Sequence, residues 1–260
     1  MTKTSPEVFF SEESGVRHLH LGTQDWIQGS MRVRKPFDIE LEYVQRMMAW
    51  LLFLEPDNIS QCHAMQLGLG AGAITKFCYK KLRMHTTAVE INPQVVAMCQ
   101  SWFSLPQADE RLHIVISDAR DIVNDPSRIQ IVDALCVDIY DDDATAPVLD
   151  SVELYTHCQQ LLTDQGIMTV NLFGRTANFA KSLSRIARGF NIDQTSSTSS
   201  QRLWQFAPTS EGNTVVVALK SEPAIDRETM QQRAEIIETR WGLPARKWVK
   251  GLKTVKFSTK

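Results

Sequence analysis

A glycine-rich turn is the first feature of this 260-residue chain that could do chemistry. Gly68, Gly70 and Gly72 follow a short apolar run and precede a segment with helical spacing. Glycines at such a junction let the backbone approach a ligand closely, and the start of a helix presents free N–H groups. The same pattern also arises as ordinary turn chemistry, so the turn alone predicts a ligand site only weakly.

Two carboxylates extend this pattern to the neighbouring strands. Glu90 ends the next apolar run, where a carboxylate can accept hydrogen bonds from both hydroxyls of a ribose. Asp118 follows the third run, where it can accept from the exocyclic amine of adenine while the small Ala119 makes room for the ring. Each acid could instead be a solvated residue at a strand end. Because ligands bind at the carboxyl edge of open α/β sheets, the three features together predict a nucleoside site.

An acidic loop, DIYDDD, begins with Asp138 at the end of the fourth strand. A carboxylate there could take a proton from an attacking amine, and the loop could orient a cationic substrate. The alternatives are a solvated loop or a site for a hard metal ion, although the spacing does not fit the EF-hand pattern. The six histidines share no metal-ligand spacing, so we expect no metal.

Alternating apolar and helical segments must position these residues. The expected strands are residues 64–69, 86–91, 112–117, 134–138 and 166–172, and the expected helices between them are 74–81, 93–103, 119–124 and 151–162. Two further strands, 203–207 and 214–219, indicate a terminal antiparallel hairpin. This order predicts an α/β, Rossmann-like class I methyltransferase fold with a mostly parallel seven-stranded sheet.

Three parts of the chain are expected. Residues 1–36 form a small N-terminal β unit, residues 37–243 a methyltransferase-like nucleoside-binding domain, and residues 244–260 a basic C-terminal tail that we expect to be loose. An amphipathic helix within residues 37–54 should join the first two parts. Its surface at Met47, Met48 and Trp50 could pack against another subunit.

Composition narrows the possible partners. The formal net charge of −2 argues against nucleic acid as the main partner, because phosphate binding needs a concentrated excess of Lys and Arg. Five cysteines without a CxxC pair fit reduced, buried thiols. The N-terminus lacks the pattern of a signal peptide, and the longest apolar run is too short to cross a bilayer. We therefore expect a cytoplasmic protein with no membrane partner.

Together these motifs resemble the spermidine synthase family, the polyamine aminopropyltransferases. The resemblance runs from about residue 16 to 172 and is carried by Trp26-Ile27-Gln28, Glu42-Tyr43, GLGAG, VEIN, SDAR, VDIYD, Tyr155 and the strand at Gly166. It implies that Asp138 accepts a proton and that Asp141 helps to bind the amine substrate. It also implies that Tyr43 and Gln28 line the same cleft, and it suggests a homodimer.

The chain departs from the family pattern at the nucleoside turn and beside the family tyrosine. Where the family usually has an Asp that holds the amino group of decarboxylated S-adenosylmethionine, this chain has Ala71. Val44 replaces the usual His or Gln. Three hypotheses follow: aminopropyl transfer from decarboxylated S-adenosylmethionine to a small amine or polyamine, methyl transfer from S-adenosylmethionine to a small molecule, or a nucleoside-binding homologue without catalysis.

Overall fold

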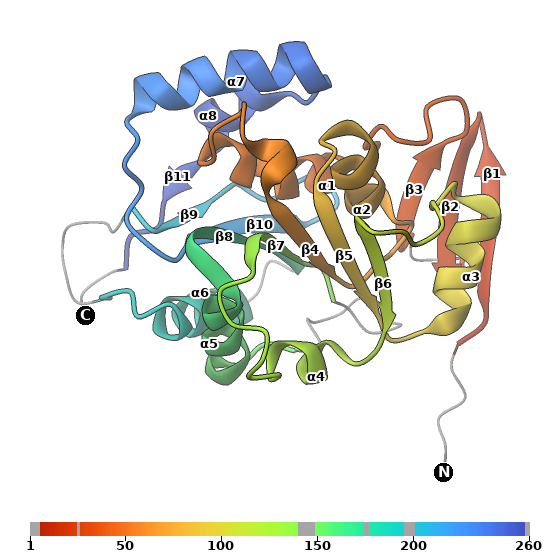
Figure 1. The fold of residues 1–260 in the computed structure, drawn as a ribbon, viewed down its shortest axis with the longest axis horizontal. Helices are drawn as coiled ribbons and strands as arrows, with labels where there is room; N and C mark the ends of the chain where they lie inside the picture. Colours follow the sequence, from red (N-terminus) through yellow and green to blue (C-terminus); the bar gives the residue numbers. More distant parts are fainter. Residues whose placement is uncertain (1–5, 25–26, 140–148, 174–176, 195–200, 258–260) are drawn as a thin grey trace.

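The computed structural model describes residues 6–24, 27–139, 149–173, 177–194 and 201–257, apart from the side chains of Phe173 and Ala177. These residues form an eight-stranded sheet with helices on both faces and a three-stranded sheet beside one edge (Figure 1). The strands of the large sheet are β4 (His63–Leu67), β5 (His85–Glu90), β6 (Leu112–Ile116), β7 (Val132–Val137), β8 (Leu162–Phe173), β9 (Leu203–Gln205), β10 (Asn213–Leu219) and β11 (Lys253–Thr254).

The large sheet has the strand order β11-β9-β10-β8-β7-β4-β5-β6. Strands β4 to β8 pair in parallel, and β10 runs antiparallel between β8 and β9. The predicted seven-stranded sheet with its antiparallel hairpin is thus confirmed, with β11 as an additional short strand. From β4 the chain adds β5 and β6 on one side of the sheet, and it then adds β7 and β8 on the other side. Open α/β sheets bind their ligands at such a reversal of strand order, which here lies between β4 and β7.

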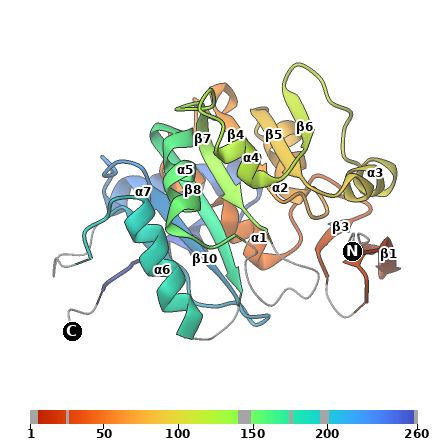
Figure 2. The same cartoon turned by 90° about the horizontal axis from the view of Figure 1, so that it is seen from below.

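Helices cover the two faces of the large sheet. The α-helices are α1 (Glu42–Met47), α2 (Ala73–Lys76), α3 (Pro93–Trp102), α4 (Ala119–Val123), α5 (Val152–Leu161), α6 (Ala177–Gly189), α7 (Arg227–Trp241) and α8 (Ala245–Gly251). Two 3-10 helices, η1 (Met48–Leu52) and η2 (Ile59–Gln61), and a π-helical segment, η3 (Phe77–Lys81), complete the described helical structure. Helices α4, α5 and α6 lie on one face, and α7 and α8 lie on the other (Figures 1 and 2).

The predicted N-terminal β unit is present as an antiparallel sheet of β1 (Val8–Glu13), β2 (Val16–Leu21) and β3 (Gly29–Arg32). Its inner face shares an apolar cluster with α3, in which Leu19, Met31 and Phe103 are buried. The unit lies next to the glycine turn. The backbone of Gly29 packs directly against Ala71, with no room for a side chain between them. Strand β3 therefore forms one wall of the region where the nucleoside is expected.

The prediction of a subunit-facing surface at Met47, Met48 and Trp50 is wrong. Met47, Met48 and Trp50 are fully buried in one cluster with α7 and α8. Every residue of η1 is buried, so the segment is apolar on all sides rather than amphipathic, and such a segment belongs in a core. This segment supplies no exposed surface for a partner.

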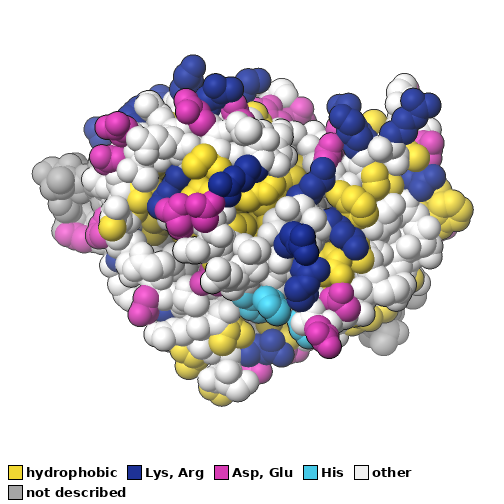
Figure 3. Space-filling view, turned by 45° about the horizontal axis from the view of Figure 1, so that its top comes forward, with side chains coloured by type: hydrophobic (Ala, Val, Ile, Leu, Met, Phe, Trp, Pro, Cys, Tyr) yellow, Lys and Arg dark blue, Asp and Glu magenta, His cyan; other side chains and the backbone are white. Residues whose placement is uncertain are grey.

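The C-terminal segment is also not the loose tail that its charges suggest. Helix α8 buries Trp248 and Val249, and β11 pairs with β9 at the edge of the sheet. The basic residues point outward while the apolar residues between them extend the core. Lys and Arg side chains lie beside Asp and Glu over α7 (Figure 3), where ion pairs such as Arg246 with Glu238 join α7 to α8. In the described part of the chain, no helix is long and apolar enough to span a bilayer.

Candidate nucleoside and amine site

The glycine turn joins β4 to α2 in a conformation that requires glycine. Gly68, Gly70 and Gly72 all have positive φ, at 85°, 51° and 68°. A Cβ at Gly68 would collide with the backbone oxygen of Asp138, and one at Gly70 would lie 2.8 Å from the backbone oxygen of Gln28. The turn therefore draws β7 and the N-terminal unit into close contact with the start of α2.

Gln66, which the sequence did not single out, fixes the shape of this turn. Its buried amide donates to the carbonyl oxygens of Gly68 (2.6 Å) and Leu69 (3.2 Å). Its side-chain oxygen accepts from the backbone N–H of Thr75 (3.0 Å) and from the hydroxyl of the same residue (2.6 Å). A glutamine in an otherwise apolar buried strand was the available signal, because a buried amide needs several partners.

Glu90 lies at the end of β5, facing the glycine turn. Its carboxylate accepts from the backbone N–H of Leu69 (2.9 Å) and, through the other oxygen, from that of Asn92 (2.9 Å). Each carboxylate oxygen has a second acceptor position, which suits the two hydroxyls of a ribose. The next residue, Ile91, is 66% exposed although it is large and apolar. Such a side chain beside Glu90 offers an apolar surface for a flat ring, and no motif in the sequence points to it.

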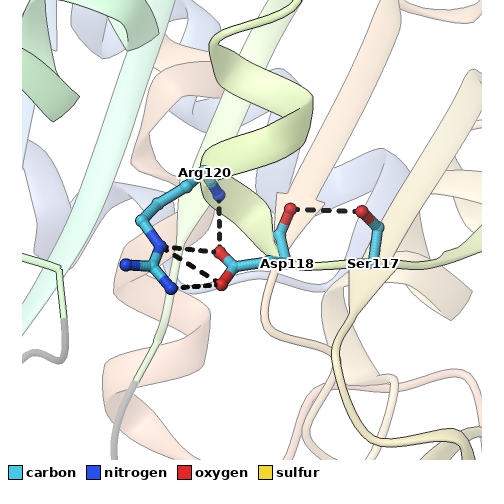
Figure 4. A network of polar contacts seen from close by, with 3 residues as sticks. All are labelled: Ser117, Asp118 and Arg120. Atoms are coloured by element: carbon cyan, nitrogen blue, oxygen red, sulfur yellow. Dashed lines mark hydrogen bonds and ion pairs between the residues drawn. The ribbon is translucent and has the colours of Figure 1, made fainter.

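Asp118 begins α4, and its carboxylate is held by Arg120. It accepts from the Arg120 backbone N–H at 2.8 Å and from the guanidinium at 2.6 Å (Figure 4). The side-chain hydrogen bond from Arg120 lowers the pKa of Asp118, so the group is ionised at neutral pH. Ala119 is buried beside it. The backbone N–H of Ser117 donates to the carbonyl of Glu90, which keeps the ends of β5 and β6 together.

Asp138 lies directly after β7 and receives hydrogen bonds from two distant elements. The Tyr43 hydroxyl from α1 donates to Oδ2 at 3.3 Å, and the Asn171 amide from β8 donates to Oδ1 at 3.0 Å. Burial raises the pKa of Asp138 to about 6, and the two hydrogen bonds oppose that effect. A carboxyl group with such a pKa is ionised at neutral pH but accepts protons more readily than an ordinary Asp.

A small open pocket lies beside Asp138 at the carboxyl edge of the sheet. It is lined by Gln28, Gly29, Ser30, Leu41, Tyr43, Val44, Gln66, Leu69, Gly70, Ala71, Ala73, Ile74 and Asp138. The structure thus brings together Gln28, Tyr43, Gly70 and Asp138, and the family resemblance implies a shared cleft for Gln28, Tyr43 and Asp138. Asp138 is the single carboxylate among these described lining residues, and much of the remaining wall is apolar.

Several predicted residues lie outside this pocket. Glu90, Asp118 and Ala119 are not among its lining residues and follow the next strands along the same edge. Asp141 lies outside the described residues. Among the residues that the structure does describe, no group of three or more His, Cys, Asp or Glu side chains has an arrangement that could hold a metal ion.

Comparison with known proteins assigns the family. No family model matches the chain. A polyamine aminopropyltransferase of Chromobacterium violaceum is 30% identical over 256 residues, which cover 98% of this chain and 92% of that protein. The chain belongs to the polyamine aminopropyltransferase family. Two polyamine aminopropyltransferases of Neisseria meningitidis, from serogroups A and B, are each 30% identical over 95% of this chain and 89% of their own length. Members of this family are transferases.

Solved structures share the fold of this aminopropyltransferase-family chain. A probable spermidine synthase from Corynebacterium glutamicum matches with a TM-score of 0.67 at 18% identity, over 97% of this chain and 94% of that one. A spermidine synthase in complex with the transition state analogue AdoDATO matches with a TM-score of 0.58 at 17% identity, over 94% and 87%. Human methyltransferase-like protein 13 in complex with SAH reaches 0.64 at 19% identity, over 77% and 92%. At these identities the likeness shows the fold alone.

Proposed function

We propose that this aminopropyltransferase-family protein transfers an aminopropyl group from decarboxylated S-adenosylmethionine to a small amine or polyamine. The observation that carries this proposal is Asp138, whose pKa of about 6 and position beside Tyr43 suit a group that accepts a proton from an amine. The family assignment supports the same reaction, because the matched relatives are named polyamine aminopropyltransferases.

The nucleoside part of the donor is proposed to bind along β4, β5 and β6. Glu90 would accept from the ribose hydroxyls, and the glycine turn would let the nucleoside lie against the backbone. Asp118 would accept from the adenine amine after exchanging part of its contact with Arg120, while Ala119 leaves space for the ring. The fit is supported by the glycine positions that no side chain could occupy and by the free acceptor positions on Glu90.

The reaction itself needs little more than alignment and a proton acceptor. The sulfonium donor supplies an activated carbon and a neutral thioether leaving group. The lone pair of the acceptor nitrogen forms the new C–N bond at the methylene carbon next to sulfur, and the C–S bond breaks with its electron pair going to sulfur. The proton released from that nitrogen passes to Asp138. Tyr43 would hold the carboxylate in position, and alignment of nitrogen and carbon would supply most of the rate.

The acceptor is proposed to be an aliphatic amine. Leu41, Val44 and Ile74 give the pocket an apolar wall, which suits the methylene chain of such a molecule. Its reacting nitrogen would lie at Asp138, and Asp141 is proposed to bind the amine as well. Gln28 would contribute a polar contact at the wall formed by the N-terminal unit.

Methyl transfer from S-adenosylmethionine is the second candidate, and Ala71 is the observation that favours it. Ala71 lines the pocket and is almost fully buried, with Gly29 packed against it. A carboxylate at this position would attract the ammonium of the decarboxylated donor and repel the carboxylate of the intact one. An alanine does neither, so the turn itself does not discriminate strongly between the two donors.

Product analysis with both donors separates these candidates. The protein is incubated with a diamine and either decarboxylated or intact S-adenosylmethionine, and the products are identified by mass spectrometry. A gain of one aminopropyl group with the decarboxylated donor supports the proposal, whereas a gain of one methyl group with the intact donor supports the second candidate. Binding of either donor without turnover, across a panel of amines, would favour a homologue without catalysis.

We also propose a cytoplasmic homodimer that works without a metal ion. The five cysteines are all free thiols, as expected in a reducing compartment. The homodimer rests on the family resemblance, and sedimentation of the purified protein tests it. Unchanged turnover after treatment with a chelator is expected if no metal takes part.

A further inference from the structure

A buried chain of hydrogen bonds runs from the β9–β10 hairpin to Asp138. The backbone N–H of Asn213 donates to the Thr209 hydroxyl at 3.2 Å. The Asn213 side-chain amide donates to the side-chain oxygen of Asn171 at 3.2 Å, and the Asn171 amide donates to Asp138 at 3.0 Å. Asn171 is 3% exposed and Asn213 is 8% exposed. Polar side chains this deeply buried depend on protein partners for their hydrogen bonds.

The sheet register explains how three such distant residues meet. Val137 pairs with Val170 across the parallel β7–β8 ladder, so Asp138 follows on beside Asn171. Asn213 pairs with Phe173 across the antiparallel β8–β10 ladder, which places it diagonally opposite Asn171 on the same face. The β9–β10 hairpin is closed by a hydrogen bond from the Thr209 N–H to the Asn213 carbonyl, which fixes Asn213 at the start of β10.

The direction of the chain determines what Asp138 experiences. An amide has a donor end and an acceptor end, and Asn171 can turn either of them toward Asp138. Because Asn213 donates to the oxygen of Asn171, that oxygen is held away from Asp138 and the NH2 group faces the carboxylate. An ionised carboxylate accepts from NH2 but is repelled by a carbonyl oxygen.

We propose that Asn213 is a positioning residue for the transfer reaction: it holds the Asn171 amide with its NH2 toward Asp138 and so keeps that carboxylate ready to accept a proton. This inference rests on the proposed role of Asp138. Asn213 itself acts through Asn171, and it does not line the pocket. The β9–β10 hairpin, which is remote in sequence from all the recognised motifs, thereby contributes to the reaction.

The other groups around Asp138 do not replace this effect. From α1 the Tyr43 hydroxyl donates to the second carboxylate oxygen, and on β7 the thiol of Cys136 is buried, which raises its pKa to about 12. Among the described residues, burial and the hydrogen bonds from Asn171 and Tyr43 are the resolved influences on the pKa of Asp138. The direction of the Asn171 amide is thus one of two polar influences that favour the ionised form.

The test is a carbon NMR titration of the Asp138 carboxyl group, assigned by comparison with Asp138→Asn. In Asn213→Ala, loss of the amide donor frees Asn171 to turn, and the pKa of Asp138 should rise by roughly half a unit to one unit. In Asn213→Asp, which has almost the same shape, the new carboxylate draws the Asn171 NH2 toward itself, and the rise should exceed about one unit. In each variant, the acidic limb of the pH profile of kcat should shift by the same number of pH units as the pKa of Asp138.

Asn124→Asp is the matched control, because Asn124 is exposed at the end of α4 and the same substitution there should leave the Asp138 titration unchanged. An unaltered Asp138 titration in a folded Asn213→Ala protein would overturn the inference. If Asn213→Ala does not fold, Asn213→Leu, which removes the amide donor at nearly the same size and adds no charge, gives the same decision. Because the titration needs no turnover, a shifted pKa in a protein without aminopropyl transfer would refute the proposed function, while the control of the Asn171 amide and of Asp138 by Asn213 would stand.

Discussion

The two halves of the proposed site, one for the nucleoside and one for the acceptor amine, differ in how their carboxylates are held. In the nucleoside half, Glu90 accepts from two backbone N–H groups and Asp118 is paired with Arg120, whose hydrogen bond lowers the pKa of Asp118. In the acceptor half, Asp138 is enclosed by α1, β7 and β8, and burial raises its pKa to about 6. A carboxylate with a lowered pKa, such as Asp118, stays charged at neutral pH and suits binding, whereas Asp138 can exchange a proton near neutral pH. Substitutions in the nucleoside half should therefore lower donor affinity, whereas substitutions around Asp138 should lower kcat.

Glu90→Ala should have the largest effect on the binding of the aminopropyl donor. The backbone N–H groups of Leu69 and Asn92 lose their acceptor, and the ribose hydroxyls lose theirs as well. At about 1–3 kcal/mol for each ribose hydroxyl left without an acceptor, the affinity for decarboxylated S-adenosylmethionine should fall by roughly 100-fold or more. The two unpaired backbone N–H groups should lower the free energy of unfolding instead. Calorimetric titration measures the loss of affinity. The donor affinity of Glu90→Gln, which keeps one acceptor oxygen, should lie between that of Glu90→Ala and that of the wild type. Wild-type affinity in Glu90→Ala would show that Glu90 does not bind the nucleoside.

Asp138→Asn should stabilise the protein, but only where Asp138 is ionised. The folded pKa lies above the ordinary value, so the cost of burying the charge is absent below about pH 4, grows as the pH rises, and is complete above about pH 6. The gain in unfolding free energy should reach up to about 3 kcal/mol at pH 8 and vanish near pH 4. Denaturant unfolding at the two pH values measures it, and an equal gain at both would show that Asp138 is not a costly buried charge.

Tyr43→Phe should have a smaller effect, confined to the acceptor half. The hydrogen bond from Tyr43 lowers the pKa of Asp138, so its loss should raise that pKa by less than about one unit, because the contact is long at 3.3 Å. The kcat value should fall several-fold near pH 6 and recover at higher pH, with donor affinity unchanged. A loss of kcat that persists at every pH would instead indicate a direct role of Tyr43 in the reaction.

Arg120→Ala should have the smallest effect. Arg120 is well exposed, and exposed ion pairs contribute little, so donor affinity should change by less than about five-fold. The direction should be an increase, because the Asp118 carboxylate becomes free for the adenine amine while the backbone hydrogen bond at residue 120 remains. Titration of this variant beside Asp118→Asn, which should bind more weakly, shows whether Asp118 contacts the nucleoside.

The positions of the residues in the proposed nucleoside half were predictable because these residues belong to local patterns. Gly68, Glu90 and Asp118 each end or follow a strand, and the carboxyl ends of parallel strands must meet at one edge. The acceptor half depends on residues far apart in sequence. Asn171 and Asn213 stand in apolar strands, and their contact follows only from the register of β8 with β7 and β10. Sequence spacing carries no information about that register.

The two predictions that the structure contradicts are wrong for one physical reason, which is that the apolar side chains of both segments are buried in the core. The sequence predicts an exposed surface at Met47, Met48 and Trp50 of an amphipathic helix, but η1 is an unbroken apolar run that has no polar side and is buried throughout. The sequence also predicts a loose basic tail over residues 244–260, although Trp248 and Leu252 fix this segment to the core. Long cationic side chains extend outward from such a helix without loosening it.

The most direct test of the proposed function compares donor binding and turnover in Asp138→Asn. Calorimetry measures the affinity for decarboxylated S-adenosylmethionine, and product formation with a saturating diamine measures kcat. We expect donor affinity close to that of the wild type and a kcat lower by roughly 100- to 10,000-fold, because a proton acceptor has been lost. Normal turnover in a folded Asp138→Asn protein would contradict the assignment of Asp138 as the group that accepts the proton.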